Sequence, residues 1–101
     1  MSTWTFSFYA RAWAAESLTL EYGFADNSSF ANQVGNVTAG PYNLTTSWQR
    51  FTETITIAQA PAGTNRCLVF ELNGDTTNDV FLTGFQLDPG PVATPFEHRP
   101  I

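Results

Sequence analysis

Residues 4–13, WTFSFYARAW, alternate cleanly between two sets of side chains. A repeat of two residues is that of a β-strand, in which successive side chains point to opposite faces. One face would carry Trp4, Phe6, Phe8, Ala10 and Ala12, and the other Thr5, Ser7, Tyr9, Arg11 and Trp13. We predict that the first set forms a core face and that the second can touch water or a ligand.

Other stretches have the composition of strands and are separated by turn-forming residues. The strand-like stretches are residues 18–22, 48–57, 66–73 and 80–87, with a weaker one at 30–37. The clearest turns are Asp26-Asn27-Ser28-Ser29, Ala39-Gly40-Pro41-Tyr42-Asn43, Asn73-Gly74-Asp75 and Asp88-Pro89-Gly90-Pro91. No run keeps an apolar stripe at helical spacing for three turns. The pattern therefore predicts an all-β fold, an antiparallel β-sandwich of jelly-roll type.

The same pattern predicts pairing and the inward faces of the later strands. Residues 4–13 and 18–22 are expected to form an antiparallel hairpin. Leu68, Phe70 and Leu72 are expected to point inward from the strand 66–73. In the strand 80–87, Phe81, Phe85 and Leu87 are expected to share one face, with Val80, Leu82 and Gln86 on the other. Glu53 falls on the apolar face of the strand 48–57, which a sheet tolerates near an edge or with a partner. Val92 and Phe96 predict that the segment after the last strand packs onto the body.

Composition limits the classes of partner. A chain of 101 residues with 43% hydrophobic and 15% aromatic residues is expected to fold as one domain over residues 1–101. The net charge is −5, from nine acidic residues against four arginines and no lysine. That balance argues against nucleic acid and anionic membrane surfaces as partners, because both need a basic patch. No apolar segment is long enough to span a bilayer. The single cysteine, Cys67, lies in an apolar run and is expected to be buried.

Catalytic chemistry finds little support in the sequence. The only histidine, His98, lies near the end of the chain, and no nucleophile-elbow sequence accompanies it. Glu21 and Glu71 could project from the same sheet as paired carboxylates, but nothing indicates a cleft around them. We therefore expect a protein that is not an enzyme and has no cofactor. A structural calcium ion is the alternative left open, with loop oxygens from Asp26, Asp75, Asp79 and Asp88.

The polar face of the first strand is the best candidate binding surface. The residues proposed to bind a ligand are Tyr9, Arg11, Trp13, Trp48, Arg50, Glu71 and Gln86, on strands expected to be neighbours. A sugar offers an apolar C–H face to aromatic rings and a rim of hydroxyls to Arg, Glu and Gln side chains. The alternative is that this face forms a subunit interface or an ordinary exposed surface with cross-strand pairs.

Three segments resemble one known family of domains. Phe85-Gln86-Leu87-Asp88, Pro89-Gly90 and Ala93-Thr94-Pro95-Phe96-Glu97-His98-Arg99-Pro100 resemble the QLE-x-G…ATPFE-x-RP ending of phage tail-fibre and related virion domains. Phe6-Ser7-Phe8-Tyr9-Ala10-Arg11-Ala12 is similar to the opening strand of these domains, and Thr46-Ser47-Trp48-Gln49-Arg50-Phe51-Thr52 to their central W-x-R-Y/F strand. Glu53 departs from the pattern, because the related domains tend to have an apolar residue there.

The resemblance implies a fold, a function and an assembly. Those domains are jelly-roll sandwiches similar to carbohydrate-binding modules. The resemblance therefore implies a receptor-binding domain of a longer fibre protein, located on the virion and outside the cell. Its implied partner is a cell-surface glycan of the host, and its implied assembly is a homotrimer. Two alternatives stay open: a structural or trimerisation domain of a fibre, and a carbohydrate-binding module of a polysaccharide-degrading enzyme.

Overall fold

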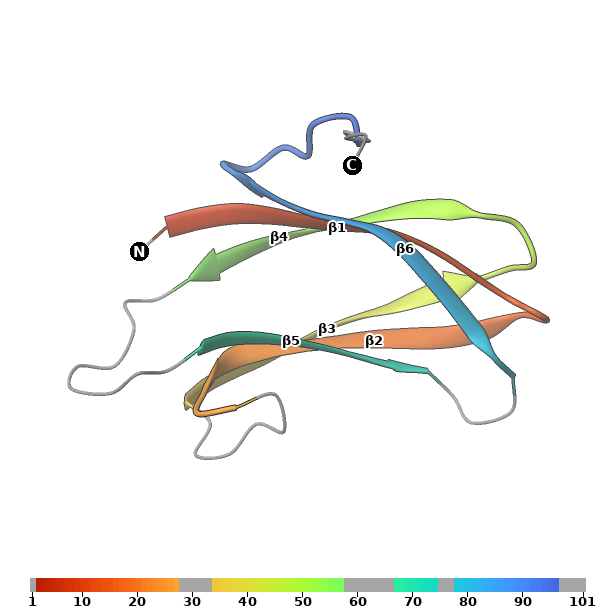
Figure 1. The fold of residues 1–101 in the computed structure, drawn as a ribbon, viewed down its shortest axis with the longest axis horizontal. Helices are drawn as coiled ribbons and strands as arrows, with labels where there is room; N and C mark the ends of the chain where they lie inside the picture. Colours follow the sequence, from red (N-terminus) through yellow and green to blue (C-terminus); the bar gives the residue numbers. More distant parts are fainter. Residues whose placement is uncertain (1, 28–33, 58–66, 75–77, 97–101) are drawn as a thin grey trace.

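The computed structural model is a β-sandwich of two antiparallel three-stranded sheets (Figure 1). It describes residues 2–27, 34–57, 67–74 and 78–96. The strands are β1 (Ser2–Ala12), β2 (Glu16–Ala25), β3 (Val34–Leu44), β4 (Gln49–Ile57), β5 (Cys67–Gly74) and β6 (Val80–Pro89). Sheet A has the order β4-β1-β6, and sheet B has the order β3-β2-β5. The predicted all-β sandwich is confirmed, and its jelly-roll type stays a prediction.

The core lies between the central strands of the two sheets. The alternation in β1 buries Phe6, Phe8, Ala10 and Ala12, and β2 contributes Leu18, Leu20 and Tyr22. Phe6 stacks on Phe70 with ring centroids 4.6 Å apart, and Phe8 meets Tyr42 edge-on at 5.5 Å. These contacts join the sheets, because Phe6 and Phe8 belong to sheet A, whereas Phe70 and Tyr42 belong to sheet B. The predicted core face of the first strand is therefore confirmed.

The predicted hairpin between the first two strands is wrong. β1 and β2 lie in different sheets, and each is the middle strand of its own sheet. Trp13-Ala14-Ala15 carries the chain from one sheet to the other. Sheets pack about 10 Å apart, a distance that a short extended link can span. Placing both strands centrally lets their apolar faces meet across the core, whereas the alternation alone does not specify the partner.

The Gly40-Pro41 turn predicted from sequence lies inside a strand. β3 runs through it to Leu44, and the pairing with β2 shifts between Leu18 and Leu20 because β3 has an extra residue there. Gly40 has φ of +99°, a conformation that glycine adopts without steric cost. Pro41 has no N–H to donate to a neighbouring strand. Proline is tolerated here because β3 is an edge strand, which pairs with another strand on one side only.

A bulge in β6 reverses the faces predicted for that strand. Ser7 pairs with Gln86 and Tyr9 with Thr83, so two residues of β6 stand opposite Phe8. Phe81 consequently lies on the outer face of sheet A, paired with Arg11, whereas Phe85 lies on the inner face at the edge of the sheet, where it stacks on Phe6 and stays half-exposed. The prediction that Phe81 and Phe85 share a face is therefore wrong. Gly84 permits the bulge with φ of +64°, and a Cβ there would lie 2.7 Å from Tyr9 Cδ2.

Glu53, the acidic residue on an apolar face, lies on an edge strand and also has a hydrogen-bond partner, the two conditions under which a sheet tolerates it. β4 is an edge strand of sheet A, and the Tyr42 hydroxyl donates to Glu53 Oε1 at 2.6 Å. Burial raises the pKa of Tyr42, and the hydrogen bond to the Glu53 carboxylate raises it further. Burial also raises the pKa of Tyr22, with the charge of Glu53 as the second cause. The Tyr42–Glu53 bond thus joins the two sheets within the interior.

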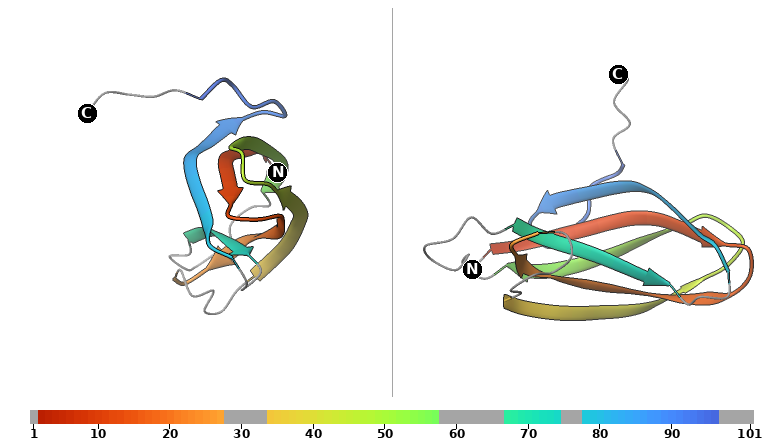
Figure 2. Two further views of the ribbon diagram at one scale, coloured as in Figure 1. Left: turned by 90° about the vertical axis from the view of Figure 1, so that its right-hand side faces the viewer. Right: turned by 60° about the horizontal axis from the view of Figure 1, so that its bottom comes forward.

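The segment after β6 folds back over sheet A, as predicted. We name residues 91–96 the C-terminal strap (Figure 2). Before the strap, Gly90 donates to Thr3 O at 2.8 Å, and Thr5 Oγ1 donates to Gly90 O at 2.8 Å. Phe96 meets the Tyr9 ring edge-on at 6.1 Å, whereas Val92 remains exposed. The strap therefore covers part of the face that the sequence left open.

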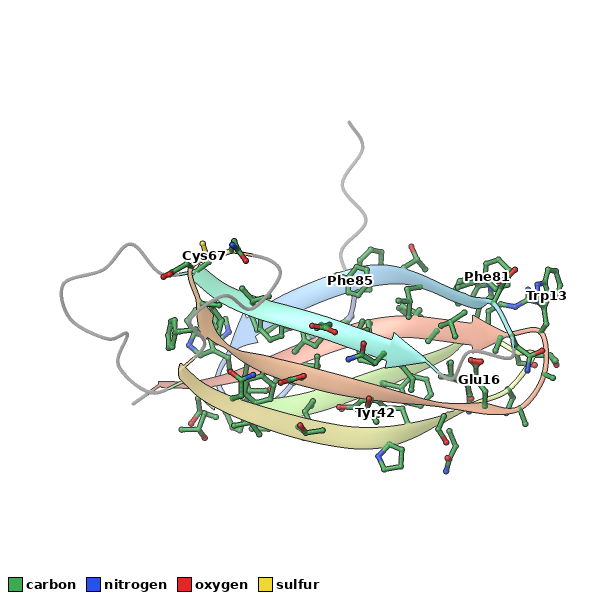
Figure 3. All side chains as sticks on the ribbon, turned by 90° about the horizontal axis from the view of Figure 1, so that it is seen from below. Trp13, Glu16, Tyr42, Cys67, Phe81 and Phe85 are labelled. Atoms are coloured by element: carbon green, nitrogen blue, oxygen red, sulfur yellow. The ribbon has the colours of Figure 1, made fainter. Side chains whose placement is uncertain are left out.

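Cys67 is exposed, and its predicted burial is wrong. It is the first residue of β5, an edge strand of sheet B, and lies at the end of the sandwich opposite Trp13 (Figure 3). The apolar residues that follow it are only partly buried, although Phe70 and Leu72 pack against the core. An apolar run therefore does not imply that its first residue is buried when that residue begins an edge strand.

Candidate functional site

Three aromatic rings surround the guanidinium of Arg11 on the outer face of sheet A. Its Cζ lies 5.6 Å from the ring centroid of Trp13, 5.9 Å from that of Trp48 and 5.7 Å from that of Phe81. We name these four residues the arginine–aromatic cluster. A cation within about 6 Å of an aromatic face is attracted by the ring's quadrupole. Each ring comes from a different part of the chain, so the folded sheet assembles the cluster.

The strand order explains how these side chains meet. Arg11 and Phe81 are register partners in β1 and β6, so both point outward from the same position of the sheet. Trp13 follows β1 directly, and its ring meets Phe81 edge-on with centroids 5.1 Å apart (Figure 3). Trp48 directly precedes β4, on the other side of β1. The Ala12 amide donates to Thr45 O at 2.9 Å and so holds the link before β4 against the end of β1.

The cluster presents aromatic surface to solvent. Trp13 is 60% exposed and Trp48 is 48% exposed, which is unusual for the largest apolar side chain. Arg11 itself is partly exposed, and its Nε is buried without a hydrogen-bond partner. Among the residues described, none accepts a hydrogen bond from the Arg11 side chain or forms an ion pair with it. The site therefore combines two open ring systems with a cation whose donors are not engaged by any residue that the structure describes.

Tyr9 and Arg50 form a second group on the same face, and this group is covered. Arg50 Nη2 donates to Ser7 Oγ at 3.0 Å, and its Cζ lies 5.8 Å from the Tyr9 ring. Phe96 of the strap also contacts Tyr9, with the two rings edge-on. Ser7 is fully buried and Thr5 is 2% exposed, although both were predicted to be able to touch water or a ligand. Both hydroxyl groups are engaged within the protein, because Ser7 accepts from Arg50 and Thr5 donates to Gly90 O.

Gln86 binds the strap. Its Nε2 donates to Thr94 Oγ1 at 2.7 Å and to Asp88 Oδ2 at 3.0 Å. Asp88 in turn accepts from the Thr94 hydroxyl and amide at 3.0 and 3.2 Å. The hydrogen bond from Gln86, followed by those from Thr94, lowers the pKa of the Asp88 carboxyl. Gln86 and Asp88 thus fix the position of the strap on β6.

Glu71 lies apart from the other six predicted residues. It belongs to β5 in sheet B, whereas Gln86 belongs to β6 in sheet A, so the expected neighbouring strands are not neighbours. Glu71 is the register partner of Glu21, which confirms that these two carboxylates project from one sheet. Glu21 accepts a hydrogen bond from Asn36 Nδ2 at 2.6 Å. The pair is therefore on the outer face of sheet B, away from the arginine–aromatic cluster.

Metal-binding groups are not assembled in the described part of the chain. No three His, Cys, Asp or Glu side chains of residues 2–27, 34–57, 67–74 and 78–96 lie close enough together to hold an ion. The oxygens of Asp88 are engaged by Gln86 and Thr94. Asp75 and His98 lie outside the described residues. Within those residues there is also no helix of the length and apolarity needed to cross a membrane.

Two members of this face were missed by sequence reasoning. Phe81 belongs to the cluster, but its position depends on the bulge at Gly84, and strict alternation grouped it on one face with Phe85 and Leu87. Phe96 was expected to pack on the body, but nothing indicated Tyr9 as its partner. Comparison of the chain with family models, curated proteins and solved structures found no match. The geometry of the face therefore carries the functional argument.

Proposed function

We propose that this chain is a non-catalytic carbohydrate-binding domain and that the arginine–aromatic cluster is its sugar site. The observation that carries the proposal is the pair of half-exposed tryptophans, Trp13 and Trp48, on either side of Arg11. Flat rings stack on the C–H face of a pyranose, and a guanidinium donates to its hydroxyls. Strand pairing in sheet A positions Arg11 and Phe81, and Trp13 and Trp48 directly flank its strands β1 and β4, so we expect the site to be formed before the ligand arrives.

The resemblance of the chain's ending to phage tail-fibre domains supports the biological setting. We propose that the glycan lies on a host cell surface and that the domain belongs to a virion fibre. A shallow site of this kind typically reaches millimolar affinity, about −4 kcal/mol. Several copies on one fibre would raise the avidity by about 10²–10⁴. Weak binding by a single domain is therefore compatible with adhesion.

A glycan array with multivalent protein tests this function. Wild-type protein displayed on beads should be retained on a subset of glycans. Trp48→Ala should weaken retention by about 2- to 10-fold, because an aromatic contact contributes about 0.5–1.5 kcal/mol beyond its buried area. Val37→Ala, which trims an exposed side chain on sheet B, is the matched control and should bind as wild type. Absence of retention on every glycan, or equal retention of both variants, would reject the proposal.

One observation favours a second function, assembly with sister chains. Phe85 is 53% exposed and Leu87 is 39% exposed, although both lie on the inner face of β6. β6 is an edge strand of sheet A, so another chain could reach these side chains. A mass measurement in solution tests this function. Assembly as the implied trimer predicts three times the 11.1 kDa of one chain, with a lower mass for Phe85→Ser. A wild-type monomer at about 100 μM would reject it.

A further inference from the structure

The proposed sugar site contains an arginine whose charge has no ion-pair partner among the residues that the structure describes. The Arg11 guanidinium lies over the rings of Trp13, Trp48 and Phe81, and none of the described residues accepts a hydrogen bond from it. Its Nε is buried, whereas the side chain as a whole is partly exposed. The accessible part is therefore the Nη end, whose two nitrogens form a planar fork. Such a fork matches the two oxygens of a carboxylate.

We propose that the arginine–aromatic cluster binds an acidic sugar, with the Nη end of Arg11 holding the sugar's carboxylate and Trp13 and Trp48 contacting its ring. This inference rests on the proposed function and narrows it to one class of glycan, those that contain uronic acids or other carboxylated sugars. The three ring centroids lie 5.6, 5.9 and 5.7 Å from the guanidinium carbon and restrict the side chain before a ligand binds. Little side-chain freedom is therefore lost when the carboxylate binds.

The distribution of charge on sheet A supports an anionic ligand. The protein as a whole carries −5, but the outward-facing ionisable side chains described on sheet A are Arg11, Arg50 and Asp88. Asp88 is hydrogen-bonded to Gln86 and Thr94, and Arg50 is bonded to Ser7. Asp79 lies just before β6 near the same end, but no ion pair joins it to Arg11. Arg11 is therefore a local positive charge on an acidic protein, next to open aromatic surface.

A purely architectural Arg11 is the competing explanation, and the two make different predictions. If Arg11 only fills space between rings, the cluster should bind neutral and acidic sugars equally. If Arg11 binds a carboxylate, removing its charge should remove the preference for acidic sugars while stacking of a neutral ring remains. The salt dependence also differs, because a partly exposed charge pair is screened by salt and ring stacking is not.

The experiment uses matched pairs of immobilised glycans that differ only by a carboxylate, such as galacturonate against galactose and glucuronate against glucose. Wild-type protein on beads should prefer the acidic member by about tenfold or more, since a hydrogen-bonded charge pair contributes at least that ratio. The preference for the acidic sugar should fall as the salt concentration is raised from about 0.05 to about 0.5 M, because the Debye screening length falls to less than half over this range. Galactose 6-sulfate and free acetate are added as competitors for the bound acidic sugar. If the site is selective for carboxylated sugars, neither should displace the sugar as well as galacturonate does.

Two variants complete the test. Arg11→Gln should abolish the preference, and Arg50→Gln, which changes net charge equally on the same face, should keep it. Circular dichroism checks that each variant is folded. Should Arg11→Gln fail to fold, the wild-type ratio and its salt dependence still decide the matter. Equal retention of acidic and neutral sugars would overturn this inference and leave the proposed function standing. No retention of either kind would overturn both.

Discussion

Replacing Tyr42 by Phe removes one hydroxyl from the interior and leaves the rest of the side chain in place. That hydroxyl donates to Glu53 Oε1 at 2.6 Å and joins sheet B to sheet A. A hydrogen bond to a charged group contributes about 1.5–3 kcal/mol. Glu53 is only partly buried, so water recovers part of the loss. We expect Tyr42→Phe to lower the free energy of unfolding by about 1.5–2.5 kcal/mol. For a domain of this size, that loss lowers Tm by about 6–20 °C.

Urea unfolding at pH 7, followed by tryptophan fluorescence, measures this change. Tyr9→Phe is the matched control, because the same atom is removed from a hydroxyl that has no hydrogen bond among the described residues. It should cost less than about 0.5 kcal/mol. The double variant Tyr42→Phe/Glu53→Leu should lose less than Tyr42→Phe alone, because no carboxylate is left without its donor. Equal stability of Tyr42→Phe and Tyr9→Phe would refute the reasoning.

Two further predictions concern the bulge and the strap. Gly84→Ala should lower the free energy of unfolding by about 1–3 kcal/mol, because φ is +64° and the new Cβ would lie 2.7 Å from Tyr9 Cδ2. Gly90 also has a positive φ, but no atom beyond those of its chain neighbours lies within 4 Å of the position of a Cβ there, so Gly90→Ala should cost less than Gly84→Ala. Equal losses of unfolding free energy for the two variants in urea would contradict the role assigned to the Tyr9 contact. Folding lowers the pKa of Asp88 below its ordinary value of 3.8. The contribution of the Asp88 carboxylate to the free energy of unfolding is therefore fully present above pH 3.8 and is lost as the pH falls through the lower pKa of the folded state. The Thr94 amide resonance should therefore titrate below pH 3.8, and a midpoint at or above 3.8 would contradict the hydrogen bonds assigned to Asp88.

The sequence predicted those features that depend on local periodicity. The alternation in β1 separated Phe6 and Phe8, which are buried, from Arg11 and Trp13, which belong to the arginine–aromatic cluster. The need of Glu53 for an edge or a partner also followed from its position on an apolar face, and both are present. These predictions hold because the direction of a side chain within a strand is fixed by its own backbone.

Features that depend on distant parts of the chain could not be predicted in this way. The alternation says which face of β1 is buried but not that β2 lies across the core from it. The bulge at Gly84 moves Phe81 to the outer face, and Arg50 of β4 bonds to Ser7, which is buried. Glu71 was grouped with Gln86 because jelly-roll pairing was expected to make their strands neighbours, whereas β5 and β6 belong to different sheets. Each error arises from the choice of partner, which periodicity does not encode.

The indole N–H resonances of the three tryptophans provide the most direct test of the sugar site. Trp13 and Trp48 belong to the arginine–aromatic cluster, whereas Trp4 packs against the core. A glycan selected on the array is titrated into ¹⁵N-labelled protein. The account predicts that the Trp13 and Trp48 signals shift together with one dissociation constant and that the Trp4 signal stays in place. A titration that moves Trp4 alone, or none of the three signals, would contradict it.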